Sequence, residues 1–501
     1  MTSPVYVYVF TAVVIAFWAW RFLSRLRPSD ASLEVAPLVQ PYIPWPITVC
    51  RFLWDIQGFM RRCEMCYGPV FRFRLAGTTV VVVSHAEGIS HILRDSQKCL
   101  SNALNQSILD TVGGVSPQPD IAAHSVLLGR LISLLKKTFA TRNSNLFAAP
   151  FKQSLIHTLE SFPCQGDVNR VSLAIFVGQC LYDSLCMSFA GPTFPTDTFA
   201  EFSSIDQYSV RFLMPFWTPP AKIFQARRSL KSKLGVFIER AAECPDAKDG
   251  CAFSGIEIAK MLRAQPNLSP SDEQGIFLGL MLAMHANTIR MVIWFMSYLL
   301  SDVDAMNRLR EEIDHAVDVD FGSLESLLSA PPHRLDGEAF PLLNSGVKEV
   351  LRLCVAAVTV REVTKSSILQ LGGNHFTFVQ NGDYVIADGY GINANDRYFE
   401  QANTFRLDRF VLAKRGDLAS EYLEPLSSFG GGAHMCKGRD FALYEMRLFV
   451  IICLRLFKLE GETSKGESTI GRTPEAVSLW PTPVFFPKET FVRILRRDVL
   501  E

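Results

Sequence analysis

The chain has 501 residues, 48% of them hydrophobic and 20% charged, which is enough for one large core or for two domains. Its 50 basic residues balance 50 acidic residues, so the net charge is zero. Nucleic-acid binding needs a strong basic excess, and this balance argues against such a partner. The 12 cysteines stand at irregular spacings without a disulfide framework, which favours a reducing compartment.

Residues 1–27 are predicted to form a membrane anchor. No charged residue lies between Val5 and Trp20, and a cluster of arginines begins at Arg21. As a helix, an apolar run of about 18 residues spans roughly 27 Å, which matches the thin bilayer of the endoplasmic reticulum. The positive charges follow the run, unlike those of a cleaved signal peptide. The positive-inside rule predicts a single-pass protein with Met1 in the lumen and the main domain in the cytosol.

Residues 28–46 are predicted to form a stiff hinge, because they contain five prolines that favour extended chain. The main domain then covers residues 47–501. Its periodicity predicts a β-hairpin, a long helical region, a group of strands and a last helix. These elements are expected at residues 67–84, 85–355, 358–387 (strands at 358–363, 368–371 and 384–387) and 442–454, respectively. The pattern predicts a mainly α fold with a smaller β subdomain.

The apolar, proline-broken stretch Phe212–Pro220 precedes five basic residues, between Lys222 and Lys233. One interpretation is a buried loop before a solvated helix face. The other is a loop that dips into the bilayer beside a substrate entrance, with cations near the lipid headgroups.

The most informative segment runs from Phe429 to Gly438 and reads F-x-x-G-x-x-x-C-x-G, with Gly432 and Cys436 at the inner positions. Glycines allow positive φ and bring the backbone close to a flat ligand, and a thiolate is an axial haem ligand that favours O–O cleavage. The alternative is a glycine-rich turn with a structural cysteine. The segment resembles the haem-binding loop of cytochrome P-450 enzymes, of the membrane-bound eukaryotic type. The resemblance implies the cytochrome P-450 fold, heme b and iron ligation by Cys436.

Two charged segments support this resemblance. Glu349 and Arg352 lie in an apolar helix over residues 342–353, where i, i+3 spacing places both charges on one face. Buried charges need partners, and Arg409 in the segment F-R-L-D-R-F is the expected third member. The resemblance assigns the three residues to a structural triad that supports the haem loop.

Residues 280–290 resemble the segment that handles oxygen in the cytochrome P-450 family. Thr288 is retained there, and Asn287 replaces the family's usual acid. A hydroxyl there can hold water and guide protons, whereas an amide can only orient water. Ala-Asn-Thr followed by Trp294-Phe resembles the branch of sterol 7α- and 12α-hydroxylases and prostacyclin synthase. Arg290 stands where that branch has proline, and we expect it to face away from the haem.

The resemblance also implies sites for the haem propionates and for a redox partner. His434 and Arg361 are the expected propionate donors, although His434 could be a solvated loop residue. A third donor from an earlier helix stays open between His124 and Arg130. Three further basic residues would contribute to a surface for an acidic reductase, unless they are ordinary solvated charges. They are Lys437, Arg439 and Arg447.

The implied activity is monooxygenation of a lipophilic substrate, such as a terpenoid or a steroid-like or other polycyclic compound, plausible in secondary-metabolite biosynthesis. Electrons would come from NADPH through a separate NADPH–cytochrome P-450 reductase, with cytochrome b5 as a further candidate partner. Two alternatives stay open. One is an isomerase or dehydratase that acts on a peroxide without reductase, and the other is a non-catalytic haem-binding sensor.

Overall fold

A computed structural model of the chain describes most of the main domain. The described residues are 36–39, 48, 51–52, 55–75, 78–94, 100–101, 110–116, 121–139, 144–162, 170–213, 218–244, 253–356, 358–371, 376–412, 428–461, 484, 486–487 and 489–497. The expected anchor over residues 1–27 and most of the expected hinge over residues 28–46 lie outside them.

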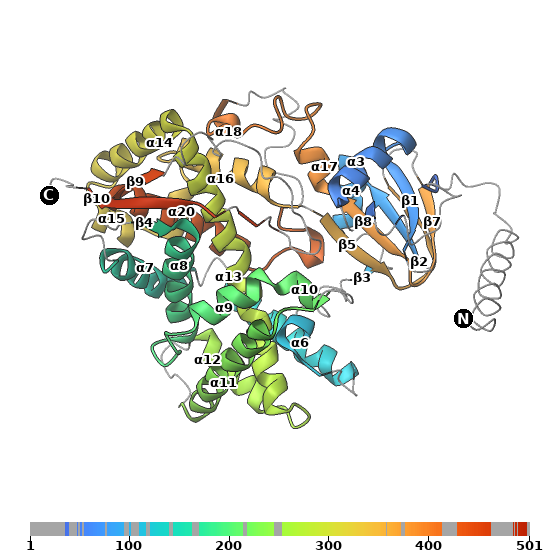
Figure 1. Cartoon of the computed structure of the whole chain (residues 1–501), viewed down its shortest axis with the longest axis horizontal. Coiled ribbons are helices and arrows are strands. Elements are labelled where there is room, and N and C mark those ends of the chain that lie inside the picture. The colour runs from blue at the N-terminus through green and yellow to red at the C-terminus, as the bar shows by residue number, and fades with distance from the viewer. Residues whose placement is uncertain are drawn as a thin grey trace, which may run out of the picture.

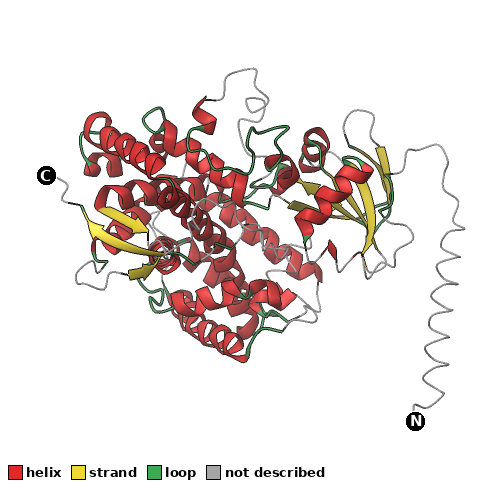
Figure 2. Ribbon diagram, turned by 45° about the horizontal axis from the view of Figure 1, so that its top comes forward, coloured by secondary structure: helices red, strands yellow, loops and turns green. Residues whose placement is uncertain are grey.

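Helices form the larger part of the described chain (Figures 1 and 2). The α-helices are α3 Ile56–Tyr67, α4 Ala86–Leu93, α6 Ile121–Thr138, α7 Ser144–Glu160, α8 Leu173–Ala190, α9 Phe199–Gln207, α10 Ser209–Leu213, α11 Ala221–Glu243, α12 Ser254–Arg263, α13 Pro270–Ser301, α14 Val303–His315, α15 Leu324–Ser329, α16 Pro341–Cys354, α17 Gly389–Asn393, α18 Arg409–Leu412 and α20 Arg439–Leu456. Three other helical turns are η2 Ala316–Asp320, η3 Pro332–Asp336 and η4 Gly432–His434.

The 32-residue helix α13 runs through the centre of the helical part (Figure 1). It begins with a strong local signal, because the Ser269 side chain accepts a hydrogen bond from the amide of Asp272 and Pro270 follows the cap. Among the described residues, α8 and α13 are long and apolar enough to cross a membrane, but most of each is buried in the protein. Both are therefore read as core helices.

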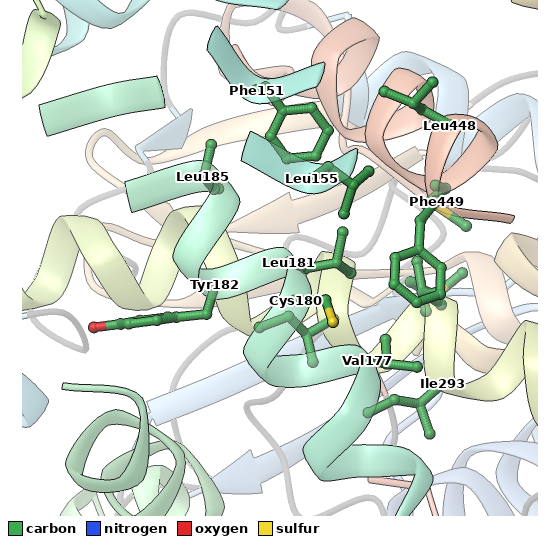
Figure 3. Close-up of a cluster of buried hydrophobic side chains, with 14 of the residues drawn as sticks. Phe151, Leu155, Val177, Cys180, Leu181, Tyr182, Leu185, Ile293, Leu448 and Phe449 are labelled. Atoms are coloured by element: carbon green, nitrogen blue, oxygen red, sulfur yellow. The ribbon is translucent and has the colours of Figure 1, made fainter. Parts of the chain in front are cut away.

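The main core lies where α7, α8, α13 and α20 meet (Figure 3). Phe151 and Leu155 from α7 lie beside Leu181 of α8, and Phe449 of α20 faces the same cluster. The α20 helix is buried on nearly all sides, which explains its continuous apolar sequence. This packing fixes α20, and with it the loop that precedes α20, against α13.

Strands lie at both ends of the helical body (Figure 2). The strands are β1 Val70–Leu75, β2 Thr78–Val83, β3 Leu100–Ser101, β4 Arg170–Ser172, β5 Val358–Val363, β6 Ser367–Gln370, β7 Phe376–Val379, β8 Tyr384–Asp388, β9 Phe457–Gly461 and β10 Phe491–Arg496. A five-stranded sheet has the order β1-β2-β8-β5-β3, a second sheet has the order β4-β10-β9, and β6 pairs with β7.

The predicted hairpin is confirmed, since β1 and β2 pair antiparallel from Val70–Val83 to Leu75–Thr78. The predicted strands at 358–363, 368–371 and 384–387 correspond to β5, β6 and β8 within a residue or two. The parallel pairing of β2 with β8 joins the hairpin to these later strands. The expected mainly α fold with a smaller β subdomain is confirmed for the described chain.

Candidate functional site

The loop that contains Cys436 is held in one shape by its backbone. The amide of Cys436 donates to the carbonyl of Phe429 over 2.9 Å, which closes the loop just before α20. Gly432 has a φ of +58°, and a Cβ added there would lie 2.1 Å from the carbonyl oxygen of Leu93. Glycine is therefore required at this position by both backbone conformation and space. The loop rests on the end of α4 as a result.

The Cys436 thiol lies on the exposed side of this loop. Surrounding protein atoms raise the pKa of the thiol by desolvation, while the backbone N–H of Gly438 and the charges of Lys437 and Arg439 act in the opposite direction. A Cβ added at Gly438 would have no neighbouring atom within 4 Å. The loop thus presents a sulfur and a bare stretch of backbone to an open side, with an N–H and two cations that favour the thiolate.

The residues expected to form a triad lie together and are almost completely buried. Both carboxylate oxygens of Glu349 accept hydrogen bonds from Arg352 at 2.8 Å. The Nε of Arg409 donates to the same two oxygens at 2.8 and 2.9 Å. One buried carboxylate is therefore shared by two guanidinium groups, and α16 is joined to the start of α18.

The two guanidinium groups of this network also donate to backbone carbonyls. Arg352 Nη1 donates to the carbonyls of Asn393 and Ala402 at 2.5 and 2.6 Å. Arg409 donates to three carbonyls between Glu400 and Thr404. Burial lowers the pKa of Arg409 and Glu349 opposes that effect. The network therefore satisfies buried charges and pins the irregular chain between α17 and α18.

One face of α13 is open in a helix that is otherwise largely buried. Ala283 is exposed, and Leu280, Met284 and Asn287 are half-buried. The spacing of these four residues places them on one side of the helix. We call this set the open face of α13. Asn287 is its last member along the chain, and its carboxamide can both donate and accept hydrogen bonds.

Thr288 lies about 100° further around the same helix and points to a different neighbour. It is buried, and its hydroxyl makes a hydrogen bond with the side chain of Glu445 on α20. The structure thus gives the Thr288 hydroxyl a partner on α20, and the expected role of Thr288 in holding water and guiding protons stays a prediction. Burial raises the pKa of Glu445 well above its usual range, which favours the protonated carboxyl in the fold.

Sequence reasoning missed Glu445. The only signal was an acidic residue inside the apolar helix predicted over residues 442–454. Its role follows from the tertiary contact, because α20 starts three residues after Cys436 and Glu445 reaches α13 beside Asn287. One helix therefore links the loop that contains Cys436 to the part of α13 that contains Asn287.

His285 lies on the opposite side of α13 from the open face, in a buried cluster with α8 and α9. Its ring lies 4.7 Å from that of Tyr182 and 5.4 Å from that of Phe202. Its Nε2 is 3.6 Å from the sulfur of Cys186, and Tyr182 extends away from the main core to donate to Thr198. Burial lowers the pKa of His285 to about 3, so this imidazole is neutral.

The expected propionate donors have different environments. Arg361 on β5 is buried and its Nη1 donates to the carbonyl of Val360 over 3.3 Å. His434 is half-buried in η4. Arg130 is exposed on α6, while the side chain of His124 lies outside the described part of the chain. His434 and Arg361 stay the predicted propionate donors, and the third donor stays open between His124 and Arg130.

The expected basic surface is smaller than the sequence indicated. Lys437 is half-buried. The pKa of its ammonium group is lowered mainly by burial and also by the nearby charge of Lys136. Arg439 pairs with the neighbouring Asp440 over 2.9 Å. The inclusion of Arg447 is wrong, because that side chain is 6% exposed and pairs with Asp336 over 2.5 Å. α20 is buried along its length, which removes Arg447 from the surface.

Comparison with known proteins decides the family. The family description "Cytochrome P450" (written cytochrome P-450 below) matches residues 39–486. The chain belongs to the cytochrome P-450 family. It is therefore an oxidoreductase whose cofactor is a haem with a thiolate-bound iron, and which receives electrons from a reductase.

Several cytochrome P-450 enzymes resemble the chain along most of its length. A 24-hydroxycholesterol 7-alpha-hydroxylase from Mus musculus is 25% identical and covers 90% of this chain and 91% of its own. Cytochrome P-450 7B1 from Mus musculus is 34% identical, with 85% and 84% covered. Cytochrome P-450 monooxygenase efuG from Hormonema carpetanum is 24% identical, with 90% and 89% covered.

A solved structure supports the fold. The retinoic acid-bound cyanobacterial cytochrome P-450 superposes with a TM-score of 0.64 at 20% identity, and covers 93% of this chain and 100% of its own. The loop geometry fits a haem, because its glycines clear the backbone beside Cys436 and no Cβ stands at Gly438. A thiol with nearby cations is also the donor that a thiolate-bound iron requires.

Proposed function

We propose that this cytochrome P-450 inserts one oxygen atom from O2 into a lipophilic polycyclic substrate, with electrons from NADPH through a separate reductase. The observation that carries the proposal is the pairing of two helices. The loop with the Cys436 thiol leads into α20, and Glu445 of α20 holds α13 beside the amide of Asn287. A thiolate and a water-orienting group thus belong to one rigid unit.

Each residue of this unit has a proposed role. Cys436 would hold the iron, and His434 and Arg361 would bind the propionates. Haem bound through a thiolate supplies O2 activation. Asn287 would orient water and substrate oxygen by donating from its Nδ2 and accepting at its Oδ1, since an amide does not titrate. Thr288 would hold water and guide protons together with Asn287, and its hydrogen bond with Glu445 would position the hydroxyl.

The remaining predicted residues would act on the scaffold rather than on the substrate. Glu349, Arg352 and Arg409 would keep the chain before the haem loop in place by their buried network. Phe429 would close the loop through its carbonyl, and Gly432 would keep it against α4. Loss of any of these contacts should reduce haem retention before it changes the chemistry.

The proposed substrate class follows from relatives whose names specify sterols. The 24-hydroxycholesterol 7-alpha-hydroxylase is one of them, and efuG shows that similar monooxygenases occur outside that group. We therefore propose a rigid, largely apolar polycycle, such as a steroid-like or terpenoid compound of secondary metabolism. The open face of α13 fits such a substrate, because it carries the apolar side chains of Leu280, Ala283 and Met284 beside the polar Asn287.

We also propose a single-pass anchorage in the endoplasmic reticulum through residues 5–20. The outer face of the β6–β7 hairpin supports the proposal of a nearby membrane, because its apolar side chains are exposed. Ile368, Phe376 and Phe378 are 44%, 39% and 42% exposed. Its inner face is buried in the same cluster as Ala36, the first described residue after the expected anchor. Aromatic residues exposed beside an anchor suit the interfacial region of a bilayer.

The function is tested with microsomes that contain the full chain and a reductase, incubated with a lipophilic extract of the native host under isotopically labelled O2. A product that needs NADPH and carries one labelled oxygen supports the proposal. A label-free product formed without NADPH would instead identify an isomerase or dehydratase. No product with any electron donor would favour a haem-binding sensor.

A further inference from the structure

Arg290 of α13 contacts two segments that are far from it in sequence, at a position close to Asn287. It lies on α13 three residues after Asn287 and is 4% exposed. Its Nη2 donates to the carboxylate of Asp206, the penultimate residue of α9. The guanidinium carbon lies 4.0 Å from the ring centroid of Phe486, which belongs to the segment after β9. That segment is tied to the end of α16, because Val484 bridges to Val355.

The position of Arg290 on the helix places this cluster at the end of the open face. An i, i+3 neighbour lies about 60° from Asn287 and one turn further along the helix. Beyond it, Met291 and Trp294 continue the same side of α13 but are buried. The open face therefore stops where Arg290 reaches across to Asp206 and Phe486 covers the guanidinium.

Holding α9 against α13 does not require this charge pair. Phe202 of α9 already contacts His285 of α13, with 5.4 Å between the ring centroids. Burying two charges is costly, and a well-packed apolar pair of similar volume is often as stable or more stable. Here the cost is visible, because burial raises the pKa of Asp206 even though Arg290 opposes it. Arg290 Nε also has no hydrogen-bond partner among the described residues.

We propose that Asp206, Arg290 and Phe486 form the end wall of the substrate space beside Asn287, and that this wall determines how far a substrate can extend along α13. The inference rests on the proposed function. The wall offers a bound polycycle an aromatic face and a neutralised charge pair instead of free volume. The wall therefore selects substrates by length. A compact ring system fits, whereas a longer one would have to displace Phe486 or the end of α9.

The test compares two azoles that differ in length and bind the iron of the full-length, haem-loaded protein in nanodiscs. Affinities of phenylimidazole and ketoconazole are read from the shift of the Soret band. Phe486→Ala and Arg290→Ala should each improve the affinity for ketoconazole relative to phenylimidazole by about tenfold, the equivalent of about 1.4 kcal/mol. The affinity for phenylimidazole should stay unchanged, because the short azole does not reach the wall.

Two matched variants separate a wall from a merely structural contact. The double variant Asp206→Leu with Arg290→Met replaces the pair by apolar side chains of similar volume, so the wall stays closed and the affinity ratio should equal that of the wild type. Arg263→Ala removes a different ion pair, with Glu273 near the start of α13, and should also leave the ratio unchanged. The reduced-CO spectrum reports haem loading in every variant.

A ratio that does not respond to Phe486→Ala or Arg290→Ala would overturn the inference, as would an equal loss of affinity for both azoles. An increase of the ratio with Arg263→Ala would also count against it, because the effect would then be general loosening. If the wild type shows no Soret shift with either azole, the proposed function fails first. The two failures are therefore distinguishable.

Discussion

Substitution of Glu445 by glutamine tests the contact between α20 and α13. Glu445 is 2% exposed, and burial raises the pKa of its carboxyl well above the ordinary range, although the Thr288 hydrogen bond opposes that effect. The fold therefore favours the protonated carboxyl, whereas the unfolded chain is ionised above an ordinary glutamate pKa of about 4.3. Glutamine has the same shape, keeps a hydrogen-bonding partner for Thr288 and does not titrate.

The sign of the effect follows from proton linkage. A raised folded-state pKa means that the stability contributed by the protonated carboxyl is fully present below the unfolded pKa and is lost as the pH rises through the folded pKa. Within that window the wild type loses about 1.4 kcal/mol per pH unit relative to Glu445→Gln. The stability advantage of the variant over the wild type should therefore grow as the pH rises above the unfolded pKa of about 4.3.

The assay is urea unfolding of full-length, haem-loaded protein at several pH values, followed by Soret absorbance and far-UV circular dichroism. The difference between variant and wild type cancels groups that titrate identically in both. Thr288→Val is the companion variant: it should lower stability, because it leaves the buried Glu445 carboxyl without its partner. A difference between wild type and Glu445→Gln that does not change with pH would refute the reasoning.

Four further outcomes are expected. Glu349→Gln should remove the charge shared by two buried guanidinium groups at a cost of about 3–5 kcal/mol, seen as loss of haem-loaded protein; a normal yield would contradict the network's role. His285→Phe should remove an acid sensitivity, because the pKa near 3 means that stability is present above the ordinary histidine value and is lost as the pH falls. Relative to the variant, the wild type should lose about 1.6 kcal/mol between about pH 6.5 and 5, and parallel unfolding curves would argue against the buried placement. Cys436→Ser should abolish the thiolate-type spectrum of the reduced CO complex, and an unchanged spectrum would remove this cysteine as the ligand. Asn287→Ala should lower the amount of product per NADPH consumed several-fold with normal haem loading, whereas unaltered coupling would exclude a role in orienting water.

The sequence predicts best those features that depend on local chemistry. The glycines around Cys436 and the i, i+3 pair in α16 are local patterns, and the structure shows the required glycine at 432 and the contact of Glu349 with Arg352. It predicts less well where a distant partner decides the direction of a side chain. The hydroxyl of Thr288 turns to Glu445, which lies far along the chain on α20.

Two other differences have the same physical origin. Arg447 reads as one more exposed cation, but α20 is enclosed by α7, α13 and α16, so its charge is paired internally with Asp336. The partners of Arg290, Asp206 and Phe486, were not foreseen either, because they come from segments on either side of α13 in sequence. Charge alone does not reveal such contacts, because the partner is set by tertiary packing.

The order of strands in the five-stranded sheet has a consequence for biosynthesis. The β2 strand pairs in parallel with β8, from Val80–Tyr384 to Val83–Ala387. At about 5–20 residues per second, the ribosome makes β2 at least ~15 s before β8 emerges. During that interval the apolar hairpin has an unsatisfied edge. Nascent chains stalled before β8 should therefore depend on chaperones, whereas chains released after β8 can close the sheet without them.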